Sequence, residues 1–351
     1  MPPAIYLDCN ASAPLHPHAR AAMLEVLDLP ANPHSVHRAG QRGFEAVERA
    51  RGQLAEALGV RPERIVYTSG ATEANALAMA LHSHAFGGKG WAVSAVEHPS
   101  VRAWGSRTLP VDGAGVVCDF PEGAEGLSVM LANNETGIIQ PVGEVVRVAR
   151  RLGVRVHIDA TQGPARMPLP AALWEADTVA LTAHKFGGPQ GVGALVVGPG
   201  VEVGTLLRGG PQERGRRAGT LNVAGIVGMG AAASRWSDWS GCAALTARLE
   251  RGVRALGGSI VGESTPRLSN TVCVRFGEHD AGDLVIALDM QGVQVSAGSA
   301  CASGSPQRSH VLAAMGIEGS ALRISVGWAT TGSEVDRALV ALATVLGQPS
   351  R

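Results

Sequence analysis

The sequence predicts an α/β fold in which chemically reactive side chains follow the ends of buried strands. Two strand-like runs point to this: residues 154–158 lead into Asp159, and residues 177–181 are followed by Lys185. A third run, 65–67, precedes a glycine turn and a helix. In parallel sheets the carboxyl ends of the strands carry the ligands. We therefore expect one binding site that draws on several neighbouring strands.

The composition is that of a globular enzyme. The chain has 351 residues, of which 45% are hydrophobic and 17% charged, with 30 basic and 30 acidic side chains. This length usually exceeds one core, so two lobes are expected. The balanced charge argues against nucleic acid as a partner, despite a basic, glycine-rich stretch at 207–220. No apolar run reaches the ~18 residues of a membrane span, so we expect a cytoplasmic protein without membrane contact.

Hydrophobic periodicity places the elements of the first lobe. Strands are expected at 5–8, 65–67, 91–96, 127–131, 154–158, 177–181 and 191–197, and helices at 41–58, 73–82 and 142–152. In the first helix Phe44, Val47, Leu54 and Leu58 recur at helical spacing, and Gly59 marks its end. This helix is expected to be scaffold.

From about residue 234 the pattern changes. A helix at 243–256 is followed by strands at 270–276 and 321–326 and by a last helix at 334–346. This order predicts a separate α+β lobe. Arg323, in the second strand, is a candidate clamp for a substrate carboxylate, because a planar guanidinium binds carboxylates through two hydrogen bonds. A surface arginine on a strand is the alternative.

Lys185 and Asp159 form the pair that pyridoxal phosphate requires. A lysine amine forms the Schiff base, and a carboxylate keeps the ring nitrogen protonated so that the ring can accept electrons. The glycine turn at 69–72 feeds a helix N-terminus, whose N–H groups suit a phosphate. We place the cofactor phosphate at Ala71 and Thr72, with an ordinary N-cap turn as the alternative.

Two other side chains are candidates for proton transfer and nucleophilic attack. His98 ends the strand at 91–96, and an imidazole titrates near neutrality; capping of the chain is the alternative. Cys301 lies among Gly, Ser and Ala in residues 295–306, a composition typical of a mobile loop in which a thiol has no packing role. The five cysteines are scattered without a Cys-x-x-Cys pair, which predicts no disulfide framework and no metal site. Of the five, we expect only Cys301 to act as a nucleophile.

Four segments, in the expected order, resemble the signature motifs of the cysteine desulfurases, which are pyridoxal-phosphate enzymes of the class V aminotransferase group. They are Ser-Gly-Ala-Thr-Glu at 69–73, His-Ile-Asp-Ala-Thr-Gln at 157–162, Thr-Ala-His-Lys at 182–185 and Ser-Ala-Cys-Ala-Ser at 299–303. The similarity runs from Tyr6 to about Ala343. It implies the type I fold of pyridoxal-phosphate-dependent transferases. A large domain, 16–233, would hold a mainly parallel seven-stranded sheet, and 1–15 and 234–351 would form a smaller α+β domain.

The resemblance also implies roles for single residues. His98 would stack on the cofactor ring, and Thr220 would reach the phosphate of the other subunit in a homodimer. Asn134 and Gln162 would contact the phenolic oxygen of the ring, and Asn134 would contact the substrate as well. The implied cofactor-binding residues are Ala71, Thr72, His98, Asn134, Asp159, Gln162, Thr182, His184, Lys185 and Thr220, with Thr182 and His184 near the phosphate.

The implied reaction converts L-cysteine to L-alanine. Lys185 would remove the α-proton, Arg323 and Asn134 would orient the substrate, and Cys301 would take its sulfur as a persulfide for a sulfur-acceptor protein. A selenocysteine lyase or another β-eliminating enzyme is the alternative. A non-catalytic sulfur-relay scaffold is less favoured, because every expected cofactor residue is present. Iron–sulfur cluster assembly, tRNA thiolation and cofactor sulfuration remain open as destinations of the sulfur.

Several positions depart from the family pattern. Cys9 stands where an aromatic or polar residue is commoner, and Trp328 replaces the usual arginine, which puts local substrate contacts or partner docking in doubt. The segment between His98 and Asn134 is shorter than in the bacterial housekeeping enzymes. The chain ends at Arg351 without their longer tail, which suggests a weaker or different partner.

Overall fold

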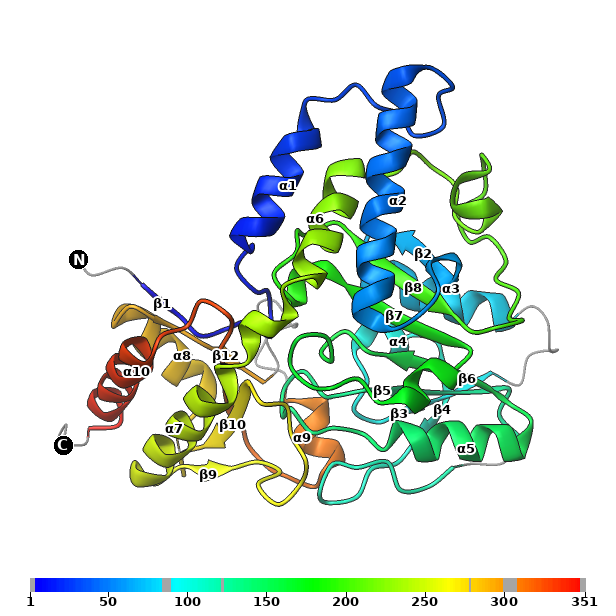
Figure 1. The fold of residues 1–351 in the computed structure, drawn as a ribbon. Coiled ribbons are helices and arrows are strands. Elements are labelled where there is room, and N and C mark those ends of the chain that lie inside the picture. Colours follow the sequence, from blue (N-terminus) through cyan, green and yellow to red (C-terminus); the bar gives the residue numbers. More distant parts are fainter. Residues whose placement is uncertain (1–3, 84–89, 121–122, 278, 299–307, 348–351) are drawn as a thin grey trace.

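The computed structural model describes residues 4–83, 90–120, 123–277, 279–298 and 308–347. A seven-stranded sheet occupies the centre of the larger lobe (Figure 1). Its strands, in spatial order, are β2 (Ile65–Thr68), β8 (Gly193–Val197), β7 (Thr178–Thr182), β6 (Arg155–Asp159), β5 (Gly126–Met130), β3 (Trp91–Ser94) and β4 (Gly105–Leu109). Neighbouring strands from β7 to β4 are parallel, whereas β8 is antiparallel to both β7 and β2. The predicted mainly parallel sheet is therefore confirmed.

The central strands are buried along most of their length because helices cover the sheet. Every residue of β5, β7 and β8 is buried. Helix α3 (Ala71–Ser83) packs on β7 and β8, and α5 (Val142–Leu152) packs on β5 and β6. Helix α5 ends at Gly153, which takes the left-handed conformation (φ 66°) that glycine adopts without strain. These connections bring the strand ends to one edge of the sheet.

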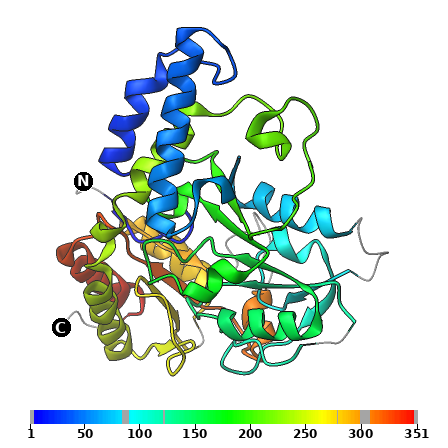
Figure 2. The same ribbon diagram turned by 45° about the vertical axis from the view of Figure 1, so that its right-hand side comes forward.

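Three helices stand together beside the sheet (Figures 1 and 2): α1 (Pro17–Leu27), α2 (Arg38–Leu58) and α6 (Val223–Ala233). Phe44 differs from the other apolar residues at its helical spacing: it is 55% exposed, whereas Val47, Leu54 and Leu58 are buried. Gly40 and Gly43 are also buried. A Cβ atom at Gly40 would lie 2.1 Å from the carbonyl oxygen of Ser35, so the close approach of the preceding loop selects glycine there.

The smaller lobe contains a four-stranded antiparallel sheet in the order β12 (Ser296–Ala297), β13 (Leu322–Ser325), β10 (Thr271–Arg275) and β9 (Ser259–Ile260). Its helices are α7 (Cys242–Ala255), α8 (Ala281–Met290) and α10 (Gly332–Val345). The N-terminal strand β1 (Ile5–Tyr6) pairs with β11 (Val293–Gln294) in the same lobe. Each lobe has its own apolar core: Trp236 packs against the core of the large lobe and Trp239 belongs to that of the small lobe. The proposed boundary at residue 234 stays a prediction.

Short elements complete the architecture. Helix α4 (Pro99–Arg102) follows β3, and α9 (His310–Ala314) precedes β13. The 3-10 turns are Pro62–Arg64, Ala171–Glu175, Ala183–Lys185, Gln212–Gly215 and Trp236–Trp239. None of the helices in the described ranges combines the length and the apolar character needed to cross a bilayer.

Candidate active site

A cavity of about 500 Å³ lies at the carboxyl ends of β5, β6 and β7. Its size falls within the range of about 300–1,000 Å³ that is usual for small-molecule sites. Its walls include Ala71, Thr72, His98, Asn134, Asp159, Gln162, Thr182, His184, Lys185 and Arg323, all of which were expected from the sequence. Thr220 is exposed and does not line the cavity, and Cys301 lies outside the described residues.

Lys185 closes the 3-10 turn that follows β7. Its Nζ atom donates hydrogen bonds to the carbonyl oxygens of Asn10 (2.6 Å) and Ala11 (2.8 Å). Both acceptors belong to the segment after β1, which crosses from the small lobe to the cavity. The amine is therefore held at the cavity wall by backbone atoms of the N-terminal segment.

Asp159 is the last residue of β6 and is 5% exposed. Its Oδ1 accepts the backbone N–H of Thr161 (3.0 Å), and its Oδ2 accepts the Nδ2 of Asn75 (2.9 Å). Each oxygen of the carboxylate therefore has a hydrogen-bond donor. Asn75 was not expected from the sequence. It lies within α3, where an asparagine has no periodic or motif signal.

The two histidines of the cavity are favoured in their neutral forms. Burial lowers the pKa of His98; Asp159 opposes this shift and Lys185 adds to it. Burial also lowers the pKa of His184, to about 4, with further contributions from Lys185 and Arg166. Burial disfavours a charged imidazole because the ring loses its hydration. Either ring can therefore offer a ligand a hydrogen bond rather than a full positive charge.

Helix α3 begins at Ala71, two residues earlier than expected, so its first turn faces the cavity. The first N–H groups of a helix have no partner within the helix and attract anions. Glu73, in the same turn, pairs with Arg217 (2.8 Å) and accepts the N–H of Ser69 (2.7 Å). Burial raises the pKa of Glu73, but these hydrogen bonds outweigh it and lower the pKa. Arg217 thus offsets the negative charge beside the anion-binding turn.

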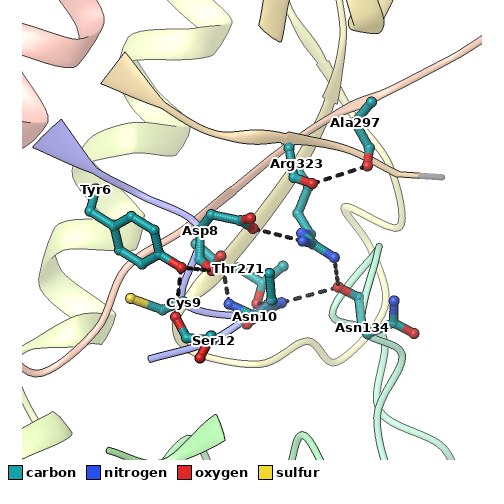
Figure 3. A network of polar contacts seen from close by, with 12 residues as sticks. Tyr6, Asp8, Cys9, Asn10, Ser12, Asn134, Thr271, Ala297 and Arg323 are labelled. Carbon is teal, nitrogen blue, oxygen red and sulfur yellow. Dashed lines mark hydrogen bonds and ion pairs between the residues drawn. The ribbon is translucent and has the colours of Figure 1, made fainter. Parts of the chain in front are cut away.

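Arg323 lies on β13 and reaches the cavity from the small lobe (Figure 3). Its Nη2 donates to Asp8 (2.7 Å), and its Nη1 donates to the carbonyl oxygen of Asn134 (3.1 Å). The residue is 3% exposed, so the surface alternative is wrong. The buried Nε has no hydrogen-bond partner among the described residues. The guanidinium is therefore oriented before any ligand binds.

Asn10 joins the two lobes at the cavity (Figure 3) and was missed by sequence reasoning. Its carbonyl oxygen accepts Lys185 Nζ and Gln162 Nε2 (3.0 Å), both from the large lobe. Its side-chain Nδ2 donates to Thr271 Oγ1 (2.9 Å) of β10 and to the carbonyl oxygen of Asn134 (3.2 Å). A single asparagine in a turn gives no such indication in the sequence, because its partners lie far away along the chain.

Trp328, which replaces the usual arginine, does not line the described cavity. Its ring centroid lies 4.6 Å from that of His16, and its Nε1 donates to the carbonyl oxygen of Pro14 (3.0 Å). His16 in turn contacts Asp238 at 3.0 Å. The substitution therefore packs a ring against the start of α1 and places no group on the cavity wall.

Three other cysteines are buried and unsuited to nucleophilic attack. Burial raises the pKa of Cys9 and of Cys273 to about 12 and that of Cys242 to about 11. Only a thiolate is a strong nucleophile, so these thiols are unreactive near neutrality. In the described part of the chain, no cluster of three or more His, Cys, Asp or Glu side chains suits a metal ion.

The residues of the cavity fit pyridoxal phosphate. Thr161 Oγ1 and Gln162 Oε1 are buried in its wall without a hydrogen-bond partner in the described structure, which is the mark of a polar ligand site. The Asp159 carboxylate, held by two donors, suits a protonated ring nitrogen. The Lys185 amine suits the reactive carbon of the cofactor, and the first turn of α3 suits its phosphate.

The fold and this donor set define a pyridoxal-phosphate enzyme of fold type I. The sequence pattern of the family described as aminotransferase class-V matches residues 5–109 and 120–338. A cysteine desulfurase from Cereibacter sphaeroides is 38% identical over 372 residues, which cover 98% of this chain and 96% of the relative. The chain belongs to the class-V aminotransferases and, among them, to the cysteine desulfurases, whose cofactor is pyridoxal phosphate.

Solved structures agree with this assignment. A NifS-like protein superposes with a TM-score of 0.90 at 32% identity, covering 98% of this chain and 99% of its own. The structure of SspA in complex with cysteine superposes with a TM-score of 0.80 at 27% identity, covering 93% of this chain and 99% of its own. The fold class expected from the sequence is confirmed.

Proposed function

We propose that this chain converts L-cysteine to L-alanine and forms a persulfide on Cys301 for transfer to a sulfur-acceptor protein. The observation that carries the proposal is the convergence of Lys185, Asp159 and Arg323 on one cavity. These three groups are a cofactor amine, a partner for the ring nitrogen and a clamp for an amino-acid carboxylate. The similarity to SspA, whose structure is in complex with cysteine, supports the choice of substrate.

Pyridoxal phosphate, when bound, serves as the electron sink that makes the α-proton of an amino acid acidic. Asp159 stabilises the protonated ring nitrogen, while Arg323 and Asn134 orient the substrate carboxylate. Lys185 would hold the cofactor and would take the α-proton of the substrate. His98, on the same cavity wall, would assist proton movement.

The sulfur step belongs to Cys301. Its thiolate attacks the substrate sulfur, so a new S–S bond forms as the Cβ–S bond breaks. The carbon product takes up a proton at Cβ, regains at Cα the proton that Lys185 removed, and leaves as alanine, and the enzyme keeps one sulfur atom as the persulfide. The thiolate becomes available again when the acceptor protein removes this sulfur. No additional oxidant or reductant is needed to form the persulfide.

We further propose a homodimer in which Thr220 contacts the phosphate held by the other subunit. Exposed apolar side chains on α1, on the loop before α2, on α2 and on the loop that precedes Thr220 support this arrangement. They are Leu24, Leu27, Val36, Phe44, Leu206 and Leu207. Burial of such side chains against a second copy would be favourable. Light scattering on the purified protein should give twice the chain mass.

The replacement Cys301→Ser tests the sulfur step. The variant should keep the visible absorbance of the bound cofactor but form no persulfide with L-cysteine, as measured by mass spectrometry and alkylation. Cys118→Ser is the matched control, because Cys118 is an exposed thiol that does not line the cavity and should be dispensable. Full desulfurase turnover by Cys301→Ser would show that another group takes the sulfur.

A further inference from the structure

Asn75 lies at the centre of a buried hydrogen-bond chain that the proposed reaction does not yet use. Its side chain is fully buried, and both N–H donors and the carbonyl oxygen have hydrogen-bond partners. Nδ2 donates to Asp159 Oδ2 (2.9 Å) and to Ser100 Oγ (2.9 Å). Oδ1 lies 3.0 Å from Nε2 of His157. The residue therefore connects β6, α3 and the start of α4.

The charge of Asp159 sets the direction of every bond in this chain. An ionised carboxylate can only accept, so Asn75 must turn its amide nitrogen toward Asp159 and its oxygen toward His157. His157 must then carry its proton on Nε2. Its Nδ1 can accept from Thr178 Oγ1, which is 2.9 Å away.

The same reasoning assigns the position of the proton on the His98 ring. Ser100 Oγ accepts the second N–H of Asn75, so its own hydrogen is free to point at His98 Nδ1, 2.7 Å away. The backbone N–H of Ser100 also donates to that nitrogen (3.2 Å). Nδ1 thus receives two donors, and the ring proton must lie on Nε2. An imidazolium would place a third hydrogen, on Nδ1, against these donors.

We propose that Asn75 is a positioning residue that, through Ser100, holds His98 as the neutral Nε2–H tautomer while its second N–H orients the Asp159 carboxylate. The proposal rests on the proposed function in taking this cavity as the cofactor site. The fixed tautomer limits the proton transfers that are open to His98. The ring can donate a hydrogen bond from Nε2 to a ligand atom, whereas it can accept a proton only after Ser100 turns its hydroxyl away from Nδ1.

The tautomer of His98 can be read in the holoenzyme labelled with ¹⁵N-histidine. We expect the Nε2–H form for wild type, with the signal assigned by its loss in His98→Gln. Ser100→Ala, at a partly exposed position that should not affect folding, removes the closer donor to Nδ1 and leaves only the backbone N–H at 3.2 Å, so part of the population should shift to the Nδ1–H tautomer. Ser100→Thr keeps the hydroxyl and should restore the wild-type signal. An unchanged Nε2–H signal in Ser100→Ala would overturn the proposal.

Asn75→Asp tests the hydrogen bond from Asn75 to Asp159, because it keeps the shape of the side chain but removes both N–H donors. Hydrogen bonds to charged groups are worth enough to change binding by roughly 10- to 100-fold. We expect cofactor affinity to fall by about that factor and the absorbance of the bound cofactor to shift. Wild-type affinity and spectrum in Asn75→Asp would contradict the role of Asn75. Absence of cysteine turnover in wild type would instead refute the proposed function and leave the tautomer measurement standing.

Discussion

At the scale of single residues, the site is defined by how its charges are paired before a ligand arrives. Arg323 is buried and held between Asp8 and the carbonyl oxygen of Asn134. Removing a long side chain's freedom in advance lowers the entropic cost of binding. A substrate carboxylate can therefore meet a guanidinium that already has the required orientation.

Arg323→Lys should raise the KM for L-cysteine by roughly 10- to 100-fold, the value of one or two charged hydrogen bonds. A lysine ammonium is a point charge and cannot bridge Asp8, Asn134 and a carboxylate as a planar guanidinium does. The absorbance of the bound cofactor should not change. Arg275→Lys, on the neighbouring strand β10 and outside the cavity wall, is the control. Equal KM values for the two variants would rule out the clamp.

Sequence reasoning found the residues whose position follows from a strand end and missed those defined only by their partners. Lys185 and Asp159 were predictable because a strand-like run ends shortly before each of them. Asn75 and Asn10 were not, because their hydrogen-bond partners lie far along the chain. The direct role of Cys301 stays a prediction, since it lies outside the described residues.

At the scale of elements, an element could be predicted when its sequence distinguishes buried from exposed positions. Helix α5 and the buried strands have strong patterns, and their places agree with expectation to within about two residues. Helix α6 is rich in Gly and Ala and buried along most of its length, so it has no polar face to mark its period. Strand β4 was missed for the opposite reason: four of its five residues are exposed and lack alternation.

The turn at 212–215 shows an ion pair overriding local backbone preference. Glu213 and Arg214 have φ angles of 47° and 58°, a left-handed conformation that costs residues other than glycine about 1–2 kcal/mol each. Glu213 is held there because its buried carboxylate accepts Arg51 Nη2 (2.7 Å) and the N–H of Tyr67 (2.8 Å). This anchor fixes the loop that leads to Thr220.

Arg214→Gly should therefore be more stable than Arg214→Ala by about 0.5–1 kcal/mol, after the greater flexibility of glycine in the unfolded chain is subtracted. Both variants lose the same exposed side chain, so the difference reports the backbone strain less the entropic cost of glycine. Urea unfolding of the two proteins measures it. The same two substitutions at Arg49, in the middle of α2, should give the opposite order of stability, with the Ala variant more stable by about 1 kcal/mol. The same order at both positions would show that position 214 is not strained.

At the scale of the whole molecule, the N-terminal segment closes the cavity between two lobes that have separate cores. Strand β1 belongs to the small lobe, yet Asn10 and Ala11 accept hydrogen bonds from Lys185 of the large lobe. The order of strands and the antiparallel β8 could not be obtained from periodicity. The resemblance supplied the mainly parallel sheet, because hydrophobic patterns identify strands but not their neighbours.

Two buried carboxyl groups make the stability of the whole protein depend on pH. Burial, with Asp159 adding to it, raises the pKa of Glu97 to about 8, and burial raises that of Glu135 to about 7. The unfolded chain releases these protons near pH 4.5, so the folded state binds more protons between that pH and about 8. Stability from these groups is therefore complete below pH 4.5 and is lost as the pH rises through 7 and 8.

Glu97→Gln should flatten the fall in unfolding free energy between pH 7 and 8.5. Ser94 Oγ and the N–H of Met130 both donate to Glu97 Oε1, and a glutamine oxygen can accept the same two bonds without ever ionising. The buried histidines do not contribute to the slope between pH 7 and 8.5, because their lowered pKa values affect stability only below about pH 6.5. Urea unfolding of the holoenzyme at several pH values tests the slope, with the exposed Glu144→Gln as the reference. If Glu97→Gln and wild type lose stability in parallel, Glu97 is already ionised in the folded protein and its burial must be compensated by another group.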